Sequence, residues 1–350
     1  MKSPAVSVIV PAYNAAGTLG RALISVVEQS FTDWELLVID DKSTDETASI
    51  CRQYCMLDSR IRYLCSPFNG GPAHARNVAL EHAKGEWITL LDADDWYEPE
   101  RLSTLLKAAA SQESQIVADN QIFMNAEFNE SKGLLTESGS SDFLTLSVSD
   151  FFEGDVIRRY SRNLGLLKPL VRRELIEQHS IRYDDRKRAA LGEDFYFLLE
   201  CLVHAKVLVY VTEPLYNYRV DGLLNISKQL KLESLFNWKS MHERYAISLA
   251  GKFQQSECRH MQNRGVQIDR YIQFRMLVDP IKQGNIAQFM LRFLKHPVRS
   301  TQLLVSDLIA DPGAILLTAT YLKLNFKQAV GRGYSRCTKW LSAKDLKKPS

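Results

Sequence analysis

Four short apolar segments, each followed by a polar loop, constrain the fold of this chain most. They comprise residues 6–10, 35–39, 61–65 and 87–91. Continuous apolar runs such as Val6-Ser-Val-Ile-Val10 are typical of strands that are buried on both faces. Helical patterns stand between the runs, for example Leu19, Leu23 and Val26. Alternating strands and helices predict an α/β fold with a mainly parallel sheet flanked by helices.

The loops after these four strands carry the polar residues that could form a site. The loops span residues 11–14, 40–45, 69–72 and 92–95. Because ligands of parallel α/β sheets bind beyond the carboxyl ends of the strands, we expect the four loops to meet at one edge of the sheet.

The remaining chain predicts a second, helical region. Residues 125–150 are rich in polar side chains and are expected to form a flexible loop region, whereas a strand is expected at 207–211. Helical patterns cover residues 230–250, 257–278 and 286–294. We therefore expect a domain at 1–220 and a helical C-terminal region at 221–350.

Composition and charge exclude several classes of protein. The chain has 350 residues, of which 45% are hydrophobic and 24% charged, as in ordinary globular proteins. Eight Lys or Arg against one acid between Lys323 and Ser350 leave the first 322 residues with a net charge of about −4, which argues against nucleic acid as a partner. No signal peptide and no apolar stretch of about 18 residues is recognised, so we expect no transmembrane helix. The six cysteines match no zinc or redox spacing and are expected to be thiols in a reducing cytoplasm.

Two acidic groups at strand ends are candidate binding residues. Asp92, Asp94 and Asp95 repel one another unless a cation is present, and oxygen ligands suit Mg²⁺ or Mn²⁺ shared with a diphosphate. Asp95 could instead cap the next helix. Asp41, in the pair Asp40-Asp41, is placed to bind a base or ribose hydroxyl, or to cap a helix.

Two further segments could carry chemistry. Asn69-Gly-Gly-Pro72 is a turn before a helix, where Arg76 could bind a phosphate or lie on the surface. Glu193 and Asp194 open an apolar helix, a position that favours negative charge and could also hold a general base. Glycine-rich dinucleotide and P-loop motifs are absent from the sequence.

These segments, taken together, resemble the family 2 glycosyltransferases, which share the GT-A fold. The resemblance covers roughly residues 5–220 and extends to bacterial enzymes of exopolysaccharide (succinoglycan-type) synthesis. It rests on six motifs in the order of the family: Val8-Ile-Val-Pro-Ala-Tyr-Asn14, Leu37-Val-Ile-Asp-Asp-Lys-Ser-Thr-Asp45, Asn69-Gly-Gly-Pro-Ala-His-Ala-Arg-Asn77, Gly85-Glu-Trp-Ile88, Leu91-Asp-Ala-Asp-Asp-Trp96 and Gly192-Glu-Asp194.

The resemblance implies a UDP-sugar donor, a divalent metal and an inverting transfer. Asp94 would bind Mn²⁺ or Mg²⁺, with Asp95 as the rival ligand. Asp194 would deprotonate the acceptor hydroxyl, with Glu193 as the second choice. Seven residues would bind the nucleotide sugar: Pro11, Tyr13, Asn14, Asp41, Arg76, Asp92 and Asp119.

The implied reaction moves a hexose such as glucose from a UDP-sugar to a glycan hydroxyl on a polyprenyl-linked exopolysaccharide intermediate. The alternative is a non-catalytic nucleotide-sugar-binding or scaffold protein. A sugar nucleotidyltransferase would need a basic phosphate loop, and residues 11–17 contain no basic side chain.

The basic C-terminal region has two interpretations. Apolar and basic residues after about 289 predict a cytoplasmic protein bound peripherally to the inner face of the membrane. A helical cap with a solvated basic tail is the alternative.

Overall fold

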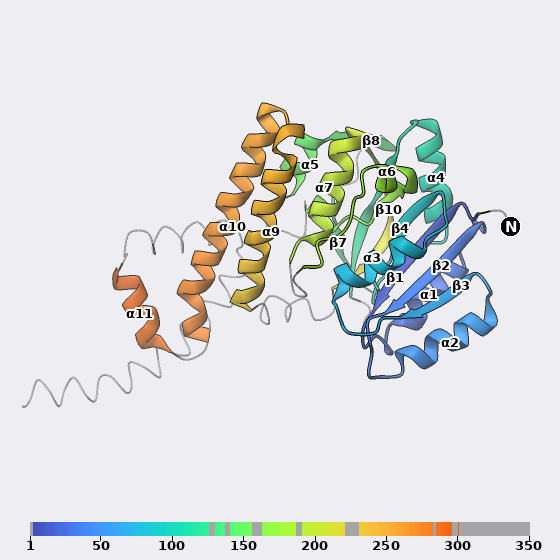
Figure 1. Cartoon of the computed structure of the whole chain (residues 1–350), viewed down its shortest axis with the longest axis horizontal. Coiled ribbons are helices and arrows are strands. Elements are labelled where there is room, and N and C mark those ends of the chain that lie inside the picture. Colours follow the sequence, from blue (N-terminus) through green and yellow to red (C-terminus); the bar gives the residue numbers. More distant parts are fainter. Residues whose placement is uncertain are drawn as a thin grey trace, which may run out of the picture. The chain divides into compact units, whose positions relative to one another are not determined.

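The computed structural model describes residues 3–125, 130–136, 141–155, 163–186, 191–220, 231–282, 285–295 and 300 (Figure 1). Its contacts divide the chain into two compact units, Met1–Ile268 and Asp269–Ser350. The basic C-terminal tail, from which membrane contact is predicted, lies outside the described residues.

The four predicted strands are present and pair in parallel. They are β1 (Val6–Ala12), β2 (Trp34–Asp40), β3 (Ile61–Cys65) and β4 (Trp87–Leu90), in the spatial order β3-β2-β1-β4. The register aligns Ala12 with Asp40 and Asp40 with Cys65, so three of these strands end together. Their loops therefore meet at one edge of the sheet, as predicted.

Antiparallel pairing extends the sheet beyond β4. Strand β9 (Leu170–Arg172) lies between β4 and β6 (Ile116–Asn125) and is antiparallel to both. Strand β10 (Val207–Arg219) runs parallel to β6 and antiparallel to β5 (Trp96–Tyr97). The described residues thus form a mixed, GT-A-type α/β sheet, which confirms the predicted fold class.

Part of the region predicted as a loop is regular structure. Residues 125–150 include β7 (Glu130–Leu134) and β8 (Phe143–Ser147), which pair with β6 and β10, and the start of α5 (Val148–Gly154). Every residue of these two strands is at least partly exposed. Backbone pairing to a sheet edge, rather than an apolar pattern, defines them, which is why the sequence gives little sign of them.

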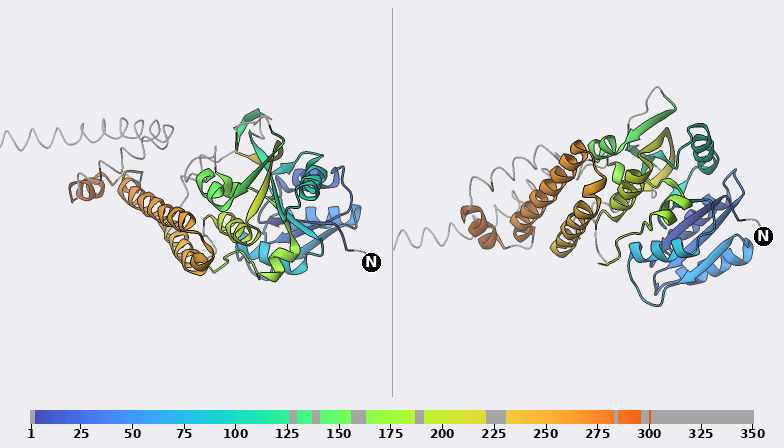
Figure 2. Two further views of the ribbon diagram at one scale, coloured as in Figure 1. Left: turned by 90° about the horizontal axis from the view of Figure 1, so that it is seen from above. Right: turned by 45° about the horizontal axis from the view of Figure 1, so that its top comes forward.

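Helices cover both faces of the sheet (Figures 1 and 2). On one face, β1 residues such as Val8 share a core with Leu23 and Leu105, from α1 (Leu19–Val27) and α4 (Arg101–Ser111), and α2 (Thr47–Leu57) adds Cys51. On the other face, Ile88 lies near Leu80 and Phe197. These belong to α3 (Pro72–His82) and α7 (Glu193–Ala205), beside α6 (Arg173–Gln178).

Helices beyond residue 220 pack on α7 within the first unit. They are α9 (Leu232–Leu249) and the part of α10 (Gln255–Lys282) up to Ile268. Tyr196 of α7 forms a hydrogen bond of 2.9 Å with His242 and stacks on Tyr245, while the Arg264 guanidinium lies 3.4 Å from the centre of the Phe195 ring. These contacts tie α9 and α10 to the helix that carries Glu193 and Asp194.

In the second unit, helix α11 (Ile286–Lys295) follows α10. No helix among the described residues is both long and apolar enough to cross a membrane.

Candidate active site

Separate elements bring four charged side chains together at the edge where the strands end. Arg76 comes from α3, and Asp92 lies two residues after the end of β4. Lys168 precedes β9, and Asp194 lies in the first turn of α7. We call Arg76, Asp92, Lys168 and Asp194 the charge ring.

The members of the charge ring alternate in sign. Arg76 Nη2 lies 3.0 Å from Asp92 Oδ1, and Arg76 Nη1 lies 2.8 Å from Asp194 Oδ1. Lys168 Nζ lies 2.9 Å from Asp92 Oδ2 and 2.5 Å from Asp194 Oδ2. Each carboxylate oxygen thus contacts one cation, and each cation bridges both carboxylates. Glu193 Oε1 lies 3.4 Å from Arg76 Nη1 at the side of the ring.

Burial and pairing shift the protonation of these groups in opposite directions. Burial disfavours the charged form of Asp92, but Lys168 and Arg76 outweigh it and lower the pKa of this carboxyl. Burial likewise opposes the charge on Lys168, yet Asp194 and Asp92 together raise its pKa. Burial and the neighbouring Asp194 raise the pKa of Glu193. Asp92, Lys168 and Arg76 therefore stay charged at neutral pH.

The start of α7 depends on a residue without a side chain. Gly192, just before Glu193, has a φ of +76°, and a Cβ added there would lie 2.9 Å from Trp238 Nε1 of α9. An L side chain is strained at this φ and would also displace the indole. Gly192 thus sets the position of the first turn of α7.

Replacement of Gly192 tests this arrangement. We expect Gly192→Ala to lower the free energy of unfolding by about 1–3 kcal/mol. Urea denaturation measures this, with two matched controls. Gly133→Ala tests a positive φ (+129°) without a neighbour within 4 Å, and Gly251→Ala tests neither effect. If Gly192→Ala loses no more unfolding free energy than Gly133→Ala, the contact with Trp238 does not contribute to the loss.

Asp94 and Asp95 differ sharply in their surroundings. Asp95 is 2% exposed, and its two oxygens accept hydrogen bonds from the Tyr216 hydroxyl (2.6 Å) and the Arg219 backbone N–H (2.7 Å). Asp94 is exposed, and no hydrogen bond or ion pair with another described side chain occupies its carboxylate. Asp95 also does not cap α4, which begins at Arg101 after Glu100.

This contrast fits a divalent metal on Asp94. Mg²⁺ in nucleotide sites takes one or two protein carboxylates together with substrate phosphates. The exposed Asp94 can supply one such ligand, whereas Asp95 is already bonded and Asp92 is paired with Arg76 and Lys168. No cluster of three or more metal-binding side chains occurs in the described part of the chain.

The residues predicted to bind the nucleotide lie around the ends of β1 and β2. Tyr13 is 48% exposed, and Asn14 has a φ of +49° and accepts a hydrogen bond from the Thr44 backbone N–H. Pro11, within β1, is partly exposed. Asp41 accepts hydrogen bonds from the backbone N–H groups of Gly70 (2.9 Å) and Gly71 (2.6 Å). Asp41, which is 3% exposed, therefore fixes the turn before α3.

Asp119 is not part of the charge ring. It is 2% exposed and accepts hydrogen bonds from Arg101 Nε and Nη2, at 3.0 and 2.7 Å. Burial raises the pKa of Asp119, although Arg101 opposes the shift. The predicted contact with a sugar has no support in this geometry, because the carboxylate is occupied. The pair instead supports the site indirectly, since Arg101 also donates to the Lys168 carbonyl.

Breaking this buried pair should be costly. We expect Asp119→Asn to lower the free energy of unfolding by about 3–5 kcal/mol, because Arg101 would keep its charge without a counter-ion. Urea denaturation gives the value. Glu177→Gln, which breaks the exposed pair with Arg173, is the control and should change stability little. A small loss of unfolding free energy in Asp119→Asn would show that the Arg101–Asp119 pair does not stabilise the fold.

Lys168 is the member of the charge ring that the sequence analysis missed. It is the one charged residue between Leu164 and Leu170, and its side chain is 2% exposed. A single lysine inside an apolar run is the available signal, because a buried lysine needs a carboxylate partner.

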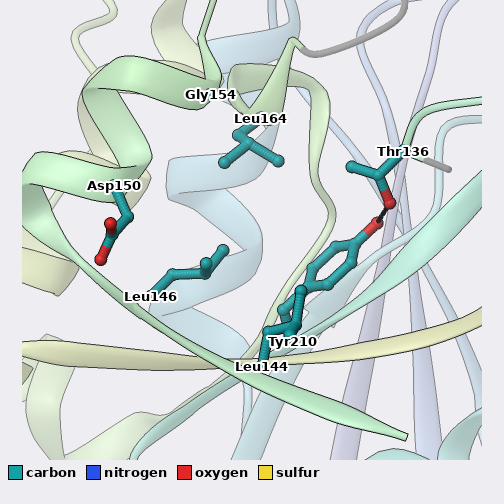
Figure 3. A pocket seen from close by; sticks show the side chains of 7 residues that line it. All are labelled: Thr136, Leu144, Leu146, Asp150, Gly154, Leu164 and Tyr210. Atoms are coloured by element: carbon teal, nitrogen blue, oxygen red, sulfur yellow. Dashed lines mark hydrogen bonds between the residues drawn. The ribbon is translucent and has the colours of Figure 1, made fainter. Parts of the chain in front are cut away.

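A cavity of about 310 Å³ lies apart from these residues (Figure 3). Its lining includes Leu146, Leu164 and Tyr210, whose hydroxyl is bonded to Thr136. None of the lining residues belongs to the charge ring, so the cavity does not mark this site.

Comparisons with known proteins place the chain in a family. A family model described as "Glycosyl transferase family 2" matches residues 7–162. The succinoglycan biosynthesis protein ExoO of Rhizobium meliloti is 30% identical over 312 residues, which cover 85% of this chain and 86% of ExoO. The chain belongs to glycosyl transferase family 2. The resemblance inferred from the motifs is thereby confirmed.

Two further relatives bear on this family 2 glycosyltransferase. A UDP-Glc:α-D-GlcNAc-diphosphoundecaprenol β-1,3-glucosyltransferase, WfgD of Escherichia coli, is 44% identical over 90 residues, 26% of this chain and 35% of WfgD. The crystal structure of S. aureus TarS 1–349 in complex with UDP-GlcNAc is 19% identical, with a TM-score of 0.60, covering 82% of this chain and 79% of that one. The second likeness supports the GT-A-type fold.

Proposed function

We propose that this glycosyltransferase transfers a hexose, such as glucose, from a UDP-sugar to a hydroxyl of a lipid-linked exopolysaccharide intermediate. The observation that carries the proposal is the charge ring, which holds Asp194 next to the segment that bears Asp92 and Asp94. The printed activity of WfgD, on a diphosphoundecaprenol acceptor, and the role of ExoO in succinoglycan biosynthesis favour the donor and acceptor classes.

Asp194 is the proposed general base. Its side chain is 18% exposed, and Oδ2, which Lys168 contacts, has a further lone pair that can accept a hydrogen bond from an acceptor hydroxyl. Asp194 takes the hydroxyl proton while the hydroxyl oxygen attacks the anomeric carbon on the face opposite the diphosphate. The bond between that carbon and the UDP oxygen breaks, UDP leaves, and the anomeric configuration inverts. Positioned bases of this kind contribute roughly 10²–10⁴ in rate.

The other residues bind and orient the donor. Tyr13 offers an exposed ring to a base, and Asp41, which holds the neighbouring Gly70-Gly71 turn, is proposed to bind the edge of that base. Asp94 would hold Mn²⁺ or Mg²⁺, which when bound supplies positive charge to the diphosphate. Arg76 adds fixed positive charge to the same edge of the sheet. The lipid-linked acceptor would reach this site from the cytoplasmic side of a membrane.

The configuration of the product tests the proposal. Incubation with UDP-α-glucose and a lipid-linked GlcNAc-diphosphate acceptor should give a β-linked product, which the anomeric coupling in proton NMR reports. An α-linked product would contradict the single displacement by way of Asp194. Binding of UDP-sugars without transfer to any acceptor would favour the non-catalytic interpretation instead.

A further inference from the structure

Lys168 is buried in a way that requires its two carboxylate partners. Its side chain is 2% exposed, and Nζ lies 2.9 Å from Asp92 Oδ2 and 2.5 Å from Asp194 Oδ2. A buried ammonium is costly unless it is paired and hydrogen-bonded. Its position is therefore fixed by the two carboxylates and, in turn, fixes them.

The orientation of the Asp194 carboxylate depends on both cations. Arg76 Nη1 forms an ion pair with Oδ1, and Lys168 Nζ donates a hydrogen bond to Oδ2. One cation alone would leave the carboxylate free to rotate about the bond between Cβ and Cγ. With a cation on each oxygen the plane of the carboxylate is set, and the lone pairs outside the ring point in one direction.

The backbone of Lys168 is itself held firmly. Its carbonyl accepts a hydrogen bond of 2.6 Å from Arg101 Nη2, and Arg101 is fully buried against Asp119. Strand β9, which starts two residues later, pairs with β4, the strand that leads to Asp92. Arg101 and strand β9 therefore connect Lys168 to the strand that leads to Asp92.

We infer that Lys168 is a positioning residue that holds Asp194 in the orientation needed to take the acceptor proton and links it to Asp92 on the donor side. The inference rests on the proposed function, because Asp194 must act as the base. Lys168 acts through Asp194, so its replacement should matter only while Asp194 is present. A misplaced catalytic group costs on the order of 10² in rate.

A double-mutant cycle tests the inference. UDP release is measured for the wild type, Lys168→Met, Asp194→Asn and the double variant, with kcat and the KM for the donor determined separately. We expect Lys168→Met to lower kcat on the order of 10² while the KM changes little, because substrate binding does not need the orientation of the base. In the Asp194→Asn background, the same replacement should cost almost nothing.

Two further variants protect the test against loss of folding. Lys168→Gln keeps much of the length of the side chain and removes its charge, and replaces Lys168→Met if that variant does not fold. Lys132→Met, which breaks the exposed pair with Glu130, should leave kcat unchanged.

Wild-type kcat in Lys168→Met, or losses that multiply in the double variant, would overturn the inference while leaving the proposed function intact. If the wild type releases no UDP from any UDP-sugar, the proposed function fails and the inference falls with it.

Discussion

Asp194→Asn should lower kcat for sugar transfer by roughly 10²–10⁴ while UDP still binds. Asparagine keeps the shape of the side chain but cannot accept the acceptor proton. The nucleotide contacts proposed for Tyr13 and Asp41 lie on other loops and do not involve Asp194. Steady-state release of UDP measures kcat, and calorimetric titration with UDP measures binding.

Asp142→Asn is the matched control for this variant, because Asp142 is exposed and belongs to none of the proposed contacts. It should retain wild-type kcat. Normal turnover in Asp194→Asn would remove Asp194 as the base. The assignment would then move to Glu193, whose raised pKa already favours proton uptake and whose Oε1 lies 3.4 Å from Arg76 Nη1.

Asp94→Asn should abolish the contribution of Mn²⁺ to UDP binding. For the wild type, a ligand at 100 times its dissociation constant adds about 2.7 kcal/mol to the free energy of unfolding. We expect this gain with UDP plus Mn²⁺ and a smaller one with UDP alone. In Asp94→Asn the two gains should be equal, because the exposed carboxylate proposed to bind the metal is gone. Thermal unfolding with and without Mn²⁺ or EDTA measures the difference.

Asp95→Asn provides the contrast to this variant. Asp95 is bonded to Tyr216 and to the Arg219 backbone, so its replacement should lower the stability of the ligand-free protein and preserve the added effect of Mn²⁺. A Mn²⁺ effect that survives in Asp94→Asn and disappears in Asp95→Asn would reverse the proposed metal ligand.

The fold could be predicted where buried segments show a recognisable pattern of apolar residues in the sequence. Strands β1, β2 and β4 are largely apolar because they are almost entirely buried, whereas β3 is fully buried only at Ile61. Strands β7 and β8 were not predicted, because they pair at sheet edges and their side chains are partly or fully exposed.

The candidate site could be predicted only in part, for a related reason. Asp92, Arg76 and Asp194 stand in motifs whose order along the chain indicates a shared edge, and the structure brings them together. Which carboxylate stays free is decided by tertiary contacts: Tyr216 and Arg219 occupy Asp95, and Arg101 occupies Asp119. Lys168 lacked a motif because its role depends on two partners that are distant in sequence.

Acceptor-dependent release of UDP by the wild-type protein is the decisive test of transfer to a glycan. We expect UDP to be released from a UDP-sugar in the presence of Mn²⁺ and a lipid-linked glycan acceptor, and release to fall to the hydrolysis background when acceptor or metal is withheld. Release that is the same with and without acceptor, across the UDP-sugars, would contradict transfer to a glycan hydroxyl as the function of this site.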